Sequence, residues 1–180
     1  MILGDSISAA YGMSLEQGWV ALLERRLADN GMAANVVNAS ISGETSGGGL
    51  RRLPQLLNEY APTLVVVELG GNDGLRGFPL ATLRRTLSAI VSQAQASGAR
   101  VLLLPMEIPP NYGQRYTRGF RQTFEQVAKE TGCTLGPFIL ESFATDAGMK
   151  QPDGIHPTAA AQPLMLDSVY PAIVARLEEQ

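Results

Sequence analysis

The chain has 180 residues, which suits one ordinary domain and is short for two, so we expect a single domain over residues 1–180. Hydrophobic residues make up 45% and charged residues 17%, a composition that excludes a disordered chain. The net charge of −3 and the aromatic share of 6% argue against a nucleic-acid partner, whether double- or single-stranded. One cysteine and one histidine exclude an internal disulfide and leave too few ligands for a structural zinc site.

No apolar run approaches the ~20 residues that a membrane-spanning helix needs. We therefore expect a soluble monomer that works without a cofactor or a metal. The chain opens with three apolar residues that lead straight into Gly4, with neither a basic segment nor a long apolar one before it. Core strands usually have about 5–6 residues, so we expect that the chain has been trimmed at its start.

Short apolar runs alternate with longer runs of helical periodicity. Residues 1–3, 35–39, 64–69 and 101–104 are typical of buried strands, and residues 134–135 predict a shorter last strand. Apolar stripes predict helices around residues 19–27, 50–60, 80–94, 116–127 and 166–177, with Gly98 placed to end the third. This alternation predicts an α/β fold, a flavodoxin-like three-layer α/β/α sandwich with a central parallel sheet of about five strands.

In such a sheet, functional residues gather where the strands end. Small and polar residues follow the expected strands at positions 4–8, 40–45 and 70–73, and a further cluster at 153–157 precedes the last helix. These segments are therefore the candidates for a functional site.

His156 is the only histidine, and its surroundings suit a catalytic base. Asp153 precedes it by three residues across a glycine, a spacing that lets a carboxylate fold back onto the imidazole Nδ1. Pro157 disfavours helical geometry at His156 and is expected to open the following helix at its first position. A histidine oriented by a carboxylate supplies two of the three groups of a serine-hydrolase triad. The alternative is that Asp153 only caps the last helix.

Ser6 directly follows the first strand and is the candidate nucleophile, the alternative being a serine that only shapes the turn. The Gly-x-Ser-x-Gly elbow of α/β-hydrolases is absent, because position 8 is Ser8 rather than glycine. A nucleophile at Ser6 therefore belongs to a different hydrolase architecture.

Four blocks of the sequence together resemble the SGNH hydrolases, also called GDSL esterases. In chain order they are Gly4-Asp5-Ser6, Gly43, Gly70-Gly71-Asn72-Asp73 and Asp153-x-x-His156. The longer strings at residues 37–43, 67–77 and 153–157 resemble the bacterial thioesterase I/protease I/lysophospholipase L1 branch, whose members are also called arylesterases. The resemblance implies a periplasmic serine hydrolase, free of cofactors, that cleaves ester and thioester bonds of acyl substrates, including lysophospholipids, through an acyl-enzyme intermediate.

The resemblance also implies a role for each site residue. Ser6 is the nucleophile, His156 the general base and acid, and Asp153 the group that orients the histidine. The oxyanion hole is formed by the backbone N–H groups of Ser6 and Gly43 together with the side-chain amide of Asn72.

Contacts to the acyl group are expected from residues 105–113, a loop that its prolines keep largely non-helical. By its position after a strand this loop overhangs the site. Met106, Ile108, Pro109 and Tyr112 are the expected substrate-binding side chains; the alternative is an ordinary loop packed on the domain.

Three other functions compete with an acyl esterase: a carbohydrate O-acetylesterase of the same fold, a binding module that lacks catalysis, and a magnesium-dependent phosphotransfer or receiver domain. The last would use Asp5, Asp73 and Asp153 as oxygen ligands. Phosphatases of that type need a second aspartate at position 7, where this chain has Ile7. The chain also has no glycine-rich Walker loop for binding phosphate. We instead expect Asp5, Asp73 and Glu44 to support the loops through hydrogen bonds to the backbone.

Overall fold

A sheet of four parallel strands forms the middle layer, in the order β1-β2-β3-β4. In the computed structural model, which describes residues 1–179, the strands are β1 (Ile2–Gly4), β2 (Leu64–Glu68), β3 (Arg100–Leu103) and β4 (Thr134–Leu135). All five residues of β2 are buried, because helices cover both faces of the sheet. A strand buried on both faces has no polar side, which explains the apolar run from Leu64 to Val67.

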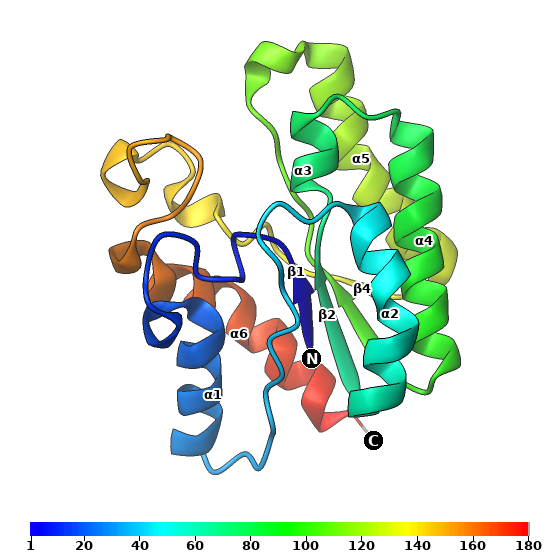
Figure 1. The fold of residues 1–180 in the computed structure, drawn as a ribbon, viewed down its shortest axis with the longest axis vertical. Helices are drawn as coiled ribbons and strands as arrows, with labels where there is room; N and C mark the ends of the chain where they lie inside the picture. Colours follow the sequence, from blue (N-terminus) through cyan, green and yellow to red (C-terminus); the bar gives the residue numbers. More distant parts are fainter. Residues whose placement is uncertain (180) are drawn as a thin grey trace.

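Two groups of helices cover the sheet, one on each face (Figure 1). The helices α1 (Trp19–Asp29) and α6 (Gln162–Glu178) pack together on one face, and α2 (Ser46–Tyr60), α4 (Leu80–Ala96) and α5 (Gln114–Thr131) on the other. The short helix α3 (Gly71–Leu75) follows β2. Single 3-10 turns lie at Leu15–Gln17, Pro110–Tyr112, Glu141–Phe143, Ala147–Met149 and Ala159–Ala161.

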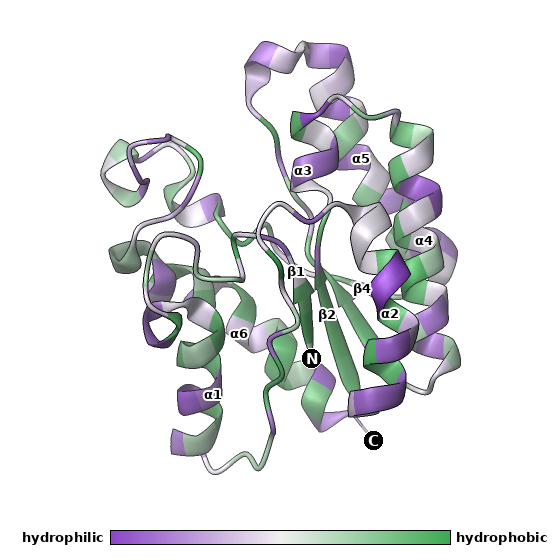
Figure 2. Cartoon of the chain, in the orientation of Figure 1, coloured by the Kyte–Doolittle hydropathy of each residue, from purple (hydrophilic) through white to green (hydrophobic). Residues whose placement is uncertain are grey.

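The core lies between the sheet and the two helical layers. Trp19, Phe120 and Phe124 are its largest fully buried side chains. Figure 2 shows the strands as mostly hydrophobic, whereas the helices combine hydrophobic and hydrophilic residues, as amphipathic helices do. Among residues 1–179, no helix is long and apolar enough to span a membrane.

The expected α/β/α fold class is confirmed, with four strands where the sequence predicted about five. The expected helices are all present; α2 begins earlier, at Ser46, because the Thr45 side chain caps it by accepting from the N–H of Gly48. The expected end of α4 is also correct, since Gly98 follows it with a φ of +90°.

The prediction of a buried strand at residues 35–39 is wrong. This segment runs beside β1 and forms one isolated bridge, between Asn38 and Ile2. Ala39 N–H donates to the Ile2 carbonyl at 2.9 Å, and Ile41 N–H donates to the Gly4 carbonyl at 3.1 Å. The segment is partly exposed because it lies at the edge of the sheet, where only β1 is available as a partner.

Candidate active site

Ser6 lies in the turn that directly follows β1, and the imidazole of His156 faces it. The distance from Ser6 Oγ to His156 Nε2 is 2.9 Å, and that from His156 Nδ1 to Asp153 Oδ2 is 2.6 Å. Because a carboxylate can only accept, the proton belongs on Nδ1, which leaves Nε2 to accept from the Ser6 hydroxyl. The structure therefore brings together the three side chains that the sequence analysis placed in a triad.

The turn that carries Asp153 is held by its own carboxylate. Asp153 Oδ1 accepts from the N–H groups of Ile155 at 2.9 Å and His156 at 3.0 Å. Gly154 takes a φ of +70°, which a glycine adopts readily. Hydrogen bonds from the His156 ring and from the two N–H groups lower the pKa of Asp153 to about 2. Asp153 therefore stays ionised and does not cap α6, which begins only at Gln162.

The prediction that Pro157 opens the last helix is wrong. Pro157 forms an isolated antiparallel bridge with Lys150, and this bridge closes the loop that carries Asp153 and His156. The last helix starts at Gln162, and Pro163 is the proline in its first turn. The loop closed in this way presents Asp153 and His156 toward Ser6.

Asn72 links the two loops that carry Ser6 and Gly43, the residues with which it was predicted to form an oxyanion hole. Its Nδ2 donates to Asp5 Oδ2 at 3.0 Å and to the Glu44 carbonyl at 3.0 Å. Asp5 and Glu44 are the chain neighbours of Ser6 and Gly43. In the hydrogen-bond pattern of residues 1–179, the N–H groups of Ser6 and Gly43 donate to no protein acceptor. The Asn72 amide thus bonds to the chain neighbours of both other predicted donors.

Three acidic residues lie beside the site, Asp5, Asp73 and Glu44, and two of them support the loops through hydrogen bonds to the backbone, as expected. Burial raises the pKa of Asp5 to about 6, although the Asn72 amide and a backbone N–H oppose the shift. Asp73 is buried and accepts from both the N–H and the hydroxyl of Ser46, at 2.8 and 2.6 Å. For Glu44 the prediction is wrong, because its side chain pairs with Arg52. Within the described part of the chain, no three such residues cluster as a metal site would require.

A buried carboxyl that the sequence analysis did not single out lies beneath the nucleophile. Glu68 ends β2 and is fully buried, and its Oε2 accepts from Ser8 Oγ at 2.7 Å and from the Asp5 N–H at 3.3 Å. Trp19 Nε1 donates to the same Ser8 hydroxyl at 3.2 Å. Burial raises the pKa of Glu68 well above its usual range, which favours the neutral acid. The signal in the sequence is an acidic residue at the end of an apolar strand.

The loop after β3 packs on α3 rather than standing free. The Tyr112 hydroxyl donates to the Leu75 carbonyl at 2.8 Å. Ile108 lies so close to Gly74 that a Cβ there would be 2.7 Å from Ile108 Cγ2. Two of the expected acyl contacts therefore adjoin the short helix that carries Asn72.

The other two expected acyl contacts differ in exposure. Pro109 is exposed. Met106 is only 4% exposed and belongs to the core, with its methyl group 3.3 Å from where a Cβ of Gly71 would lie. Met106 thus supports α3 from below and offers little surface to a substrate.

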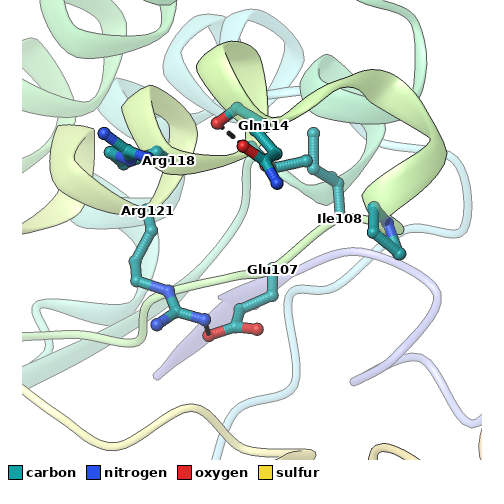
Figure 3. Close-up of a pocket in the computed structure, with 7 residues that line it drawn as sticks. Glu107, Ile108, Gln114, Arg118 and Arg121 are labelled. Carbon is teal, nitrogen blue, oxygen red and sulfur yellow. Dashed lines mark hydrogen bonds and ion pairs between the residues drawn. The ribbon is translucent and has the colours of Figure 1, made fainter.

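A cavity of about 410 Å³ opens between this loop and the first turns of α5. In Figure 3, Glu107 and Arg121 point toward one another across it and form an ion pair, while Ile108 lies near Gln114. Its lining residues are Glu107, Ile108, Pro110, Gln114, Thr117, Arg118 and Arg121. None of them belongs to the predicted triad or oxyanion hole, and Ile108 is the one residue shared with the expected acyl contacts.

The chain is similar to known hydrolases along most of its length. A model of the GDSL-like lipase/acylhydrolase family matches residues 2–163. Esterase TesA of Pseudomonas aeruginosa is 54% identical over 96% of this chain and 86% of its own length, and thioesterase 1/protease 1/lysophospholipase L1 of Escherichia coli is 46% identical over 93% and 79%. The crystal structure of the psychrotrophic esterase EstA from Pseudoalteromonas sp., inhibited by monoethylphosphonate, has a TM-score of 0.95 at 46% identity and covers 99% of this chain and 97% of that one.

Proposed function

The chain belongs to the GDSL-like lipase/acylhydrolase family, and from that premise we propose that it hydrolyses ester and thioester bonds of acyl substrates through Ser6, His156 and Asp153. The observation that carries the proposal is the unbroken hydrogen-bonded chain from Ser6 Oγ through the imidazole to Asp153 Oδ2. The esterase and thioesterase names of its relatives support the substrate class.

In the acylation step, Ser6 Oγ bonds to the acyl carbon while the hydroxyl proton passes to His156 Nε2. Asp153, held as a carboxylate, stabilises the imidazolium that results. The tetrahedral intermediate then collapses, the carbon–oxygen or carbon–sulfur bond breaks, and the imidazolium proton goes to the leaving alcohol or thiol. Ser6 is left as an acyl ester.

Deacylation repeats these steps with water as the nucleophile. His156 Nε2 takes a proton from water, and the oxygen of that water bonds to the acyl carbon. The second tetrahedral intermediate releases the carboxylic acid, and Ser6 Oγ recovers its proton from the imidazolium. The cycle consumes one water and needs no redox or metal partner to balance.

The Asn72 amide is proposed to reach the oxyanion by trading a hydrogen bond. Both of its hydrogens have acceptors in the resting enzyme, the Asp5 carboxylate and the Glu44 carbonyl. A developing oxyanion is a stronger acceptor than a neutral carbonyl. The hydrogen on the Glu44 carbonyl is therefore the one that the intermediate shares, while the other stays on Asp5 and holds the amide in place.

The acyl chain is proposed to lie along the surface that Ile108, Pro109 and Tyr112 form beside α3. Tyr112 contacts Leu75 and Ile108 contacts Gly74, three and two residues beyond Asn72. An apolar wall at this distance suits an acyl chain longer than acetate, which would bury little of its surface there.

A panel of substrates tests the proposal and separates it from an O-acetylesterase. Chromogenic acyl esters and acyl-CoA thioesters of increasing chain length are compared with acetylated sugars, for the wild type and for Ser6→Ala. We expect hydrolysis of acyl esters longer than acetate, lost in Ser6→Ala while the circular dichroism spectrum is unchanged. Turnover by a folded Ser6→Ala protein, or turnover of acetylated sugars alone, would contradict the proposal.

The family resemblance also leads us to propose that the enzyme acts as a monomer in the periplasm. A single cysteine, Cys133, suits an oxidising compartment as well as a reducing one. Fractionation of cells by osmotic shock and light scattering of the purified protein test these two points.

A further inference from the structure

The ring of Tyr11 stacks on the imidazole of His156. The two ring centroids are 4.2 Å apart, with an angle of 31° between the planes. Tyr11 is 47% exposed, so the contact is not a consequence of general burial. The imidazole nitrogens are bonded to Ser6 and Asp153, and the tyrosine covers a face of the ring that these bonds leave open.

The backbone around Tyr11 is bent in a way that few residues adopt. Ala10 has a φ of +55° and Gly12 a φ of +74°. Within residues 1–179, Ala10 is one of only two non-glycine residues with a positive φ, the other being Ala61. An L-residue takes this conformation only where its surroundings enforce it. The two left-handed residues on either side of Tyr11 direct its side chain toward the histidine loop.

Gln151 fastens the Tyr11 loop to the His156 loop. Its Nε2 donates to the carbonyl of Tyr11 at 2.8 Å and to that of Pro157 at 2.9 Å, while its own N–H donates to the His156 carbonyl at 2.7 Å. Gly12 permits this approach, because a Cβ there would lie 2.4 Å from Gln151 Oε1. The relative position of Tyr11 and His156 is therefore fixed by backbone hydrogen bonds as well as by the contact between their rings.

We propose that Tyr11 is a positioning residue for His156, which rests on the proposed role of His156 as the general base. The stacked ring limits rotation of the imidazole out of the line that joins Ser6 to Asp153. Its π face also favours the positively charged form of the imidazole that arises during each proton transfer. The other ionisable groups that act on the imidazole are Asp153, on its own loop, and Asp5, on the Tyr11 loop.

The test compares Tyr11→Phe with Tyr11→Leu. Phenylalanine keeps the π face and removes the ionisable hydroxyl, whereas leucine keeps an apolar cover of similar bulk and removes the π face. Tyr60→Leu is the matched control, because Tyr60 is also half-exposed, at 42%, and ends α2 just before β2 begins, whereas the site lies where the strands end. The readouts are kcat, KM and the pH dependence of kcat/KM with a chromogenic acyl ester, together with the melting temperature.

We expect Tyr11→Phe to match the wild type within about threefold, because phenylalanine keeps the π face over the imidazole. Tyr60→Leu should also match it, because Tyr60 lies away from the reacting groups. Tyr11→Leu should lower kcat by roughly tenfold with KM little changed, because the alignment of the base matters in the transition state and not in substrate binding. It should also move the midpoint of the acidic limb to lower pH by about half a unit, because the charged imidazole loses its π contact.

Three results would overturn the proposal. If Tyr11→Leu has the wild-type kcat, Tyr11 does not position His156. If its kcat falls but the acidic limb of the pH profile does not move, Tyr11 acts only through packing. If Tyr11→Phe is as poor as Tyr11→Leu, the effect comes from the hydroxyl and not from the π face. Failure of the proposed function is a different observation, since a His156→Ala protein would then keep its activity whatever stands at position 11.

Discussion

The two loops that meet at the candidate active site are held in place by different means. The loop after β1 is bonded to the core. Asp5 and Ser8, on either side of Ser6, donate hydrogen bonds to the buried Glu68, which lies about 60 residues further along the chain. The histidine loop is shaped mainly by short-range bonds, apart from the bond of Gln151 to the Tyr11 carbonyl, and the Asp153 side chain is 37% exposed. The nucleophile is thus positioned by the fold and the base by a local turn. Substitutions in the first loop should change both stability and activity, and those in the second chiefly activity.

The largest effect should come from the histidine loop. His156→Ala removes the base, and kcat for an acyl ester should fall by about 10⁴-fold or more. The melting temperature should change little, because the imidazole bonds to two side chains, Asp153 in its own loop and Ser6, and both loops keep their backbone bonds. Steady-state kinetics and thermal melting of the same preparation check both parts. A variant that loses most of its stability would contradict the contrast between the loops.

Asn72→Ala should lower both kcat and the free energy of unfolding. Removing an oxyanion donor lowers kcat by about 10²–10³-fold. The buried carboxyl of Asp5 also loses its side-chain donor, which should cost about 1–3 kcal/mol in the free energy of unfolding. Urea titration measures this cost. Full activity in the folded variant would remove Asn72 from the oxyanion hole.

Glu68 tests whether a neutral acid supports the nucleophile loop. Glu68→Ala leaves the Ser8 hydroxyl and the Asp5 N–H without their acceptor and should lower the free energy of unfolding by about 2–4 kcal/mol. Glu68→Gln keeps an acceptor oxygen in place of Oε2 and should be close to the wild type at pH 5. Within residues 1–179, Oε1 has no partner, so the amide replaces an atom that makes no bond.

The same pair of variants gives a pH dependence. The pKa of Glu68 is raised well above its usual range and that of Asp5 to about 6, so both carboxyls stabilise the fold most when protonated. Their contribution is complete below the unfolded values near pH 4 and is lost as the pH rises through the folded ones. Between pH 5 and pH 8, Glu68→Gln should therefore lose less stability than the wild type. Equal losses in urea titrations would show that Glu68 does not titrate.

The smallest effect concerns the bent backbone beside Tyr11. Ala10→Gly should raise the free energy of unfolding by up to about 1 kcal/mol, because glycine takes a positive φ without the steric cost that alanine bears. Ala61→Gly, at the end of α2 with a φ of +40°, is the matched change far from the site. Similar gains in melting temperature are expected for both. A destabilised Ala10→Gly protein would mean that the Ala10 methyl contributes more through packing.

Much of this molecule follows from local pattern in the sequence. The apolar runs gave the central strands, and the four motif blocks gave the family, which the match over residues 2–163 confirms. The segment at residues 35–39 was misread because apolar composition does not tell an edge segment from a central strand. Pro157 was misread because its bridge to Lys150 depends on how the loop closes, which spacing alone does not specify.

The supporting residues of the site were out of reach for a different reason. Glu68 and Ser8 are 60 residues apart, and Tyr11 and His156 lie in loops from opposite ends of the chain. Such contacts depend on tertiary packing, and neither Ser8 nor Tyr11 is unusual in its local sequence. Glu68 alone left a signal, an acidic side chain in a strand whose other residues are apolar and buried.

The most direct test of the central claim is intact-mass analysis and peptide mapping after treatment with a serine-directed organophosphonate. The account predicts one adduct, on Ser6, that blocks hydrolysis of a chromogenic acyl ester and that forms far more slowly in His156→Ala. An adduct on another serine that abolishes activity, or an active and folded protein that forms none, would contradict the assignment of Ser6 as the nucleophile.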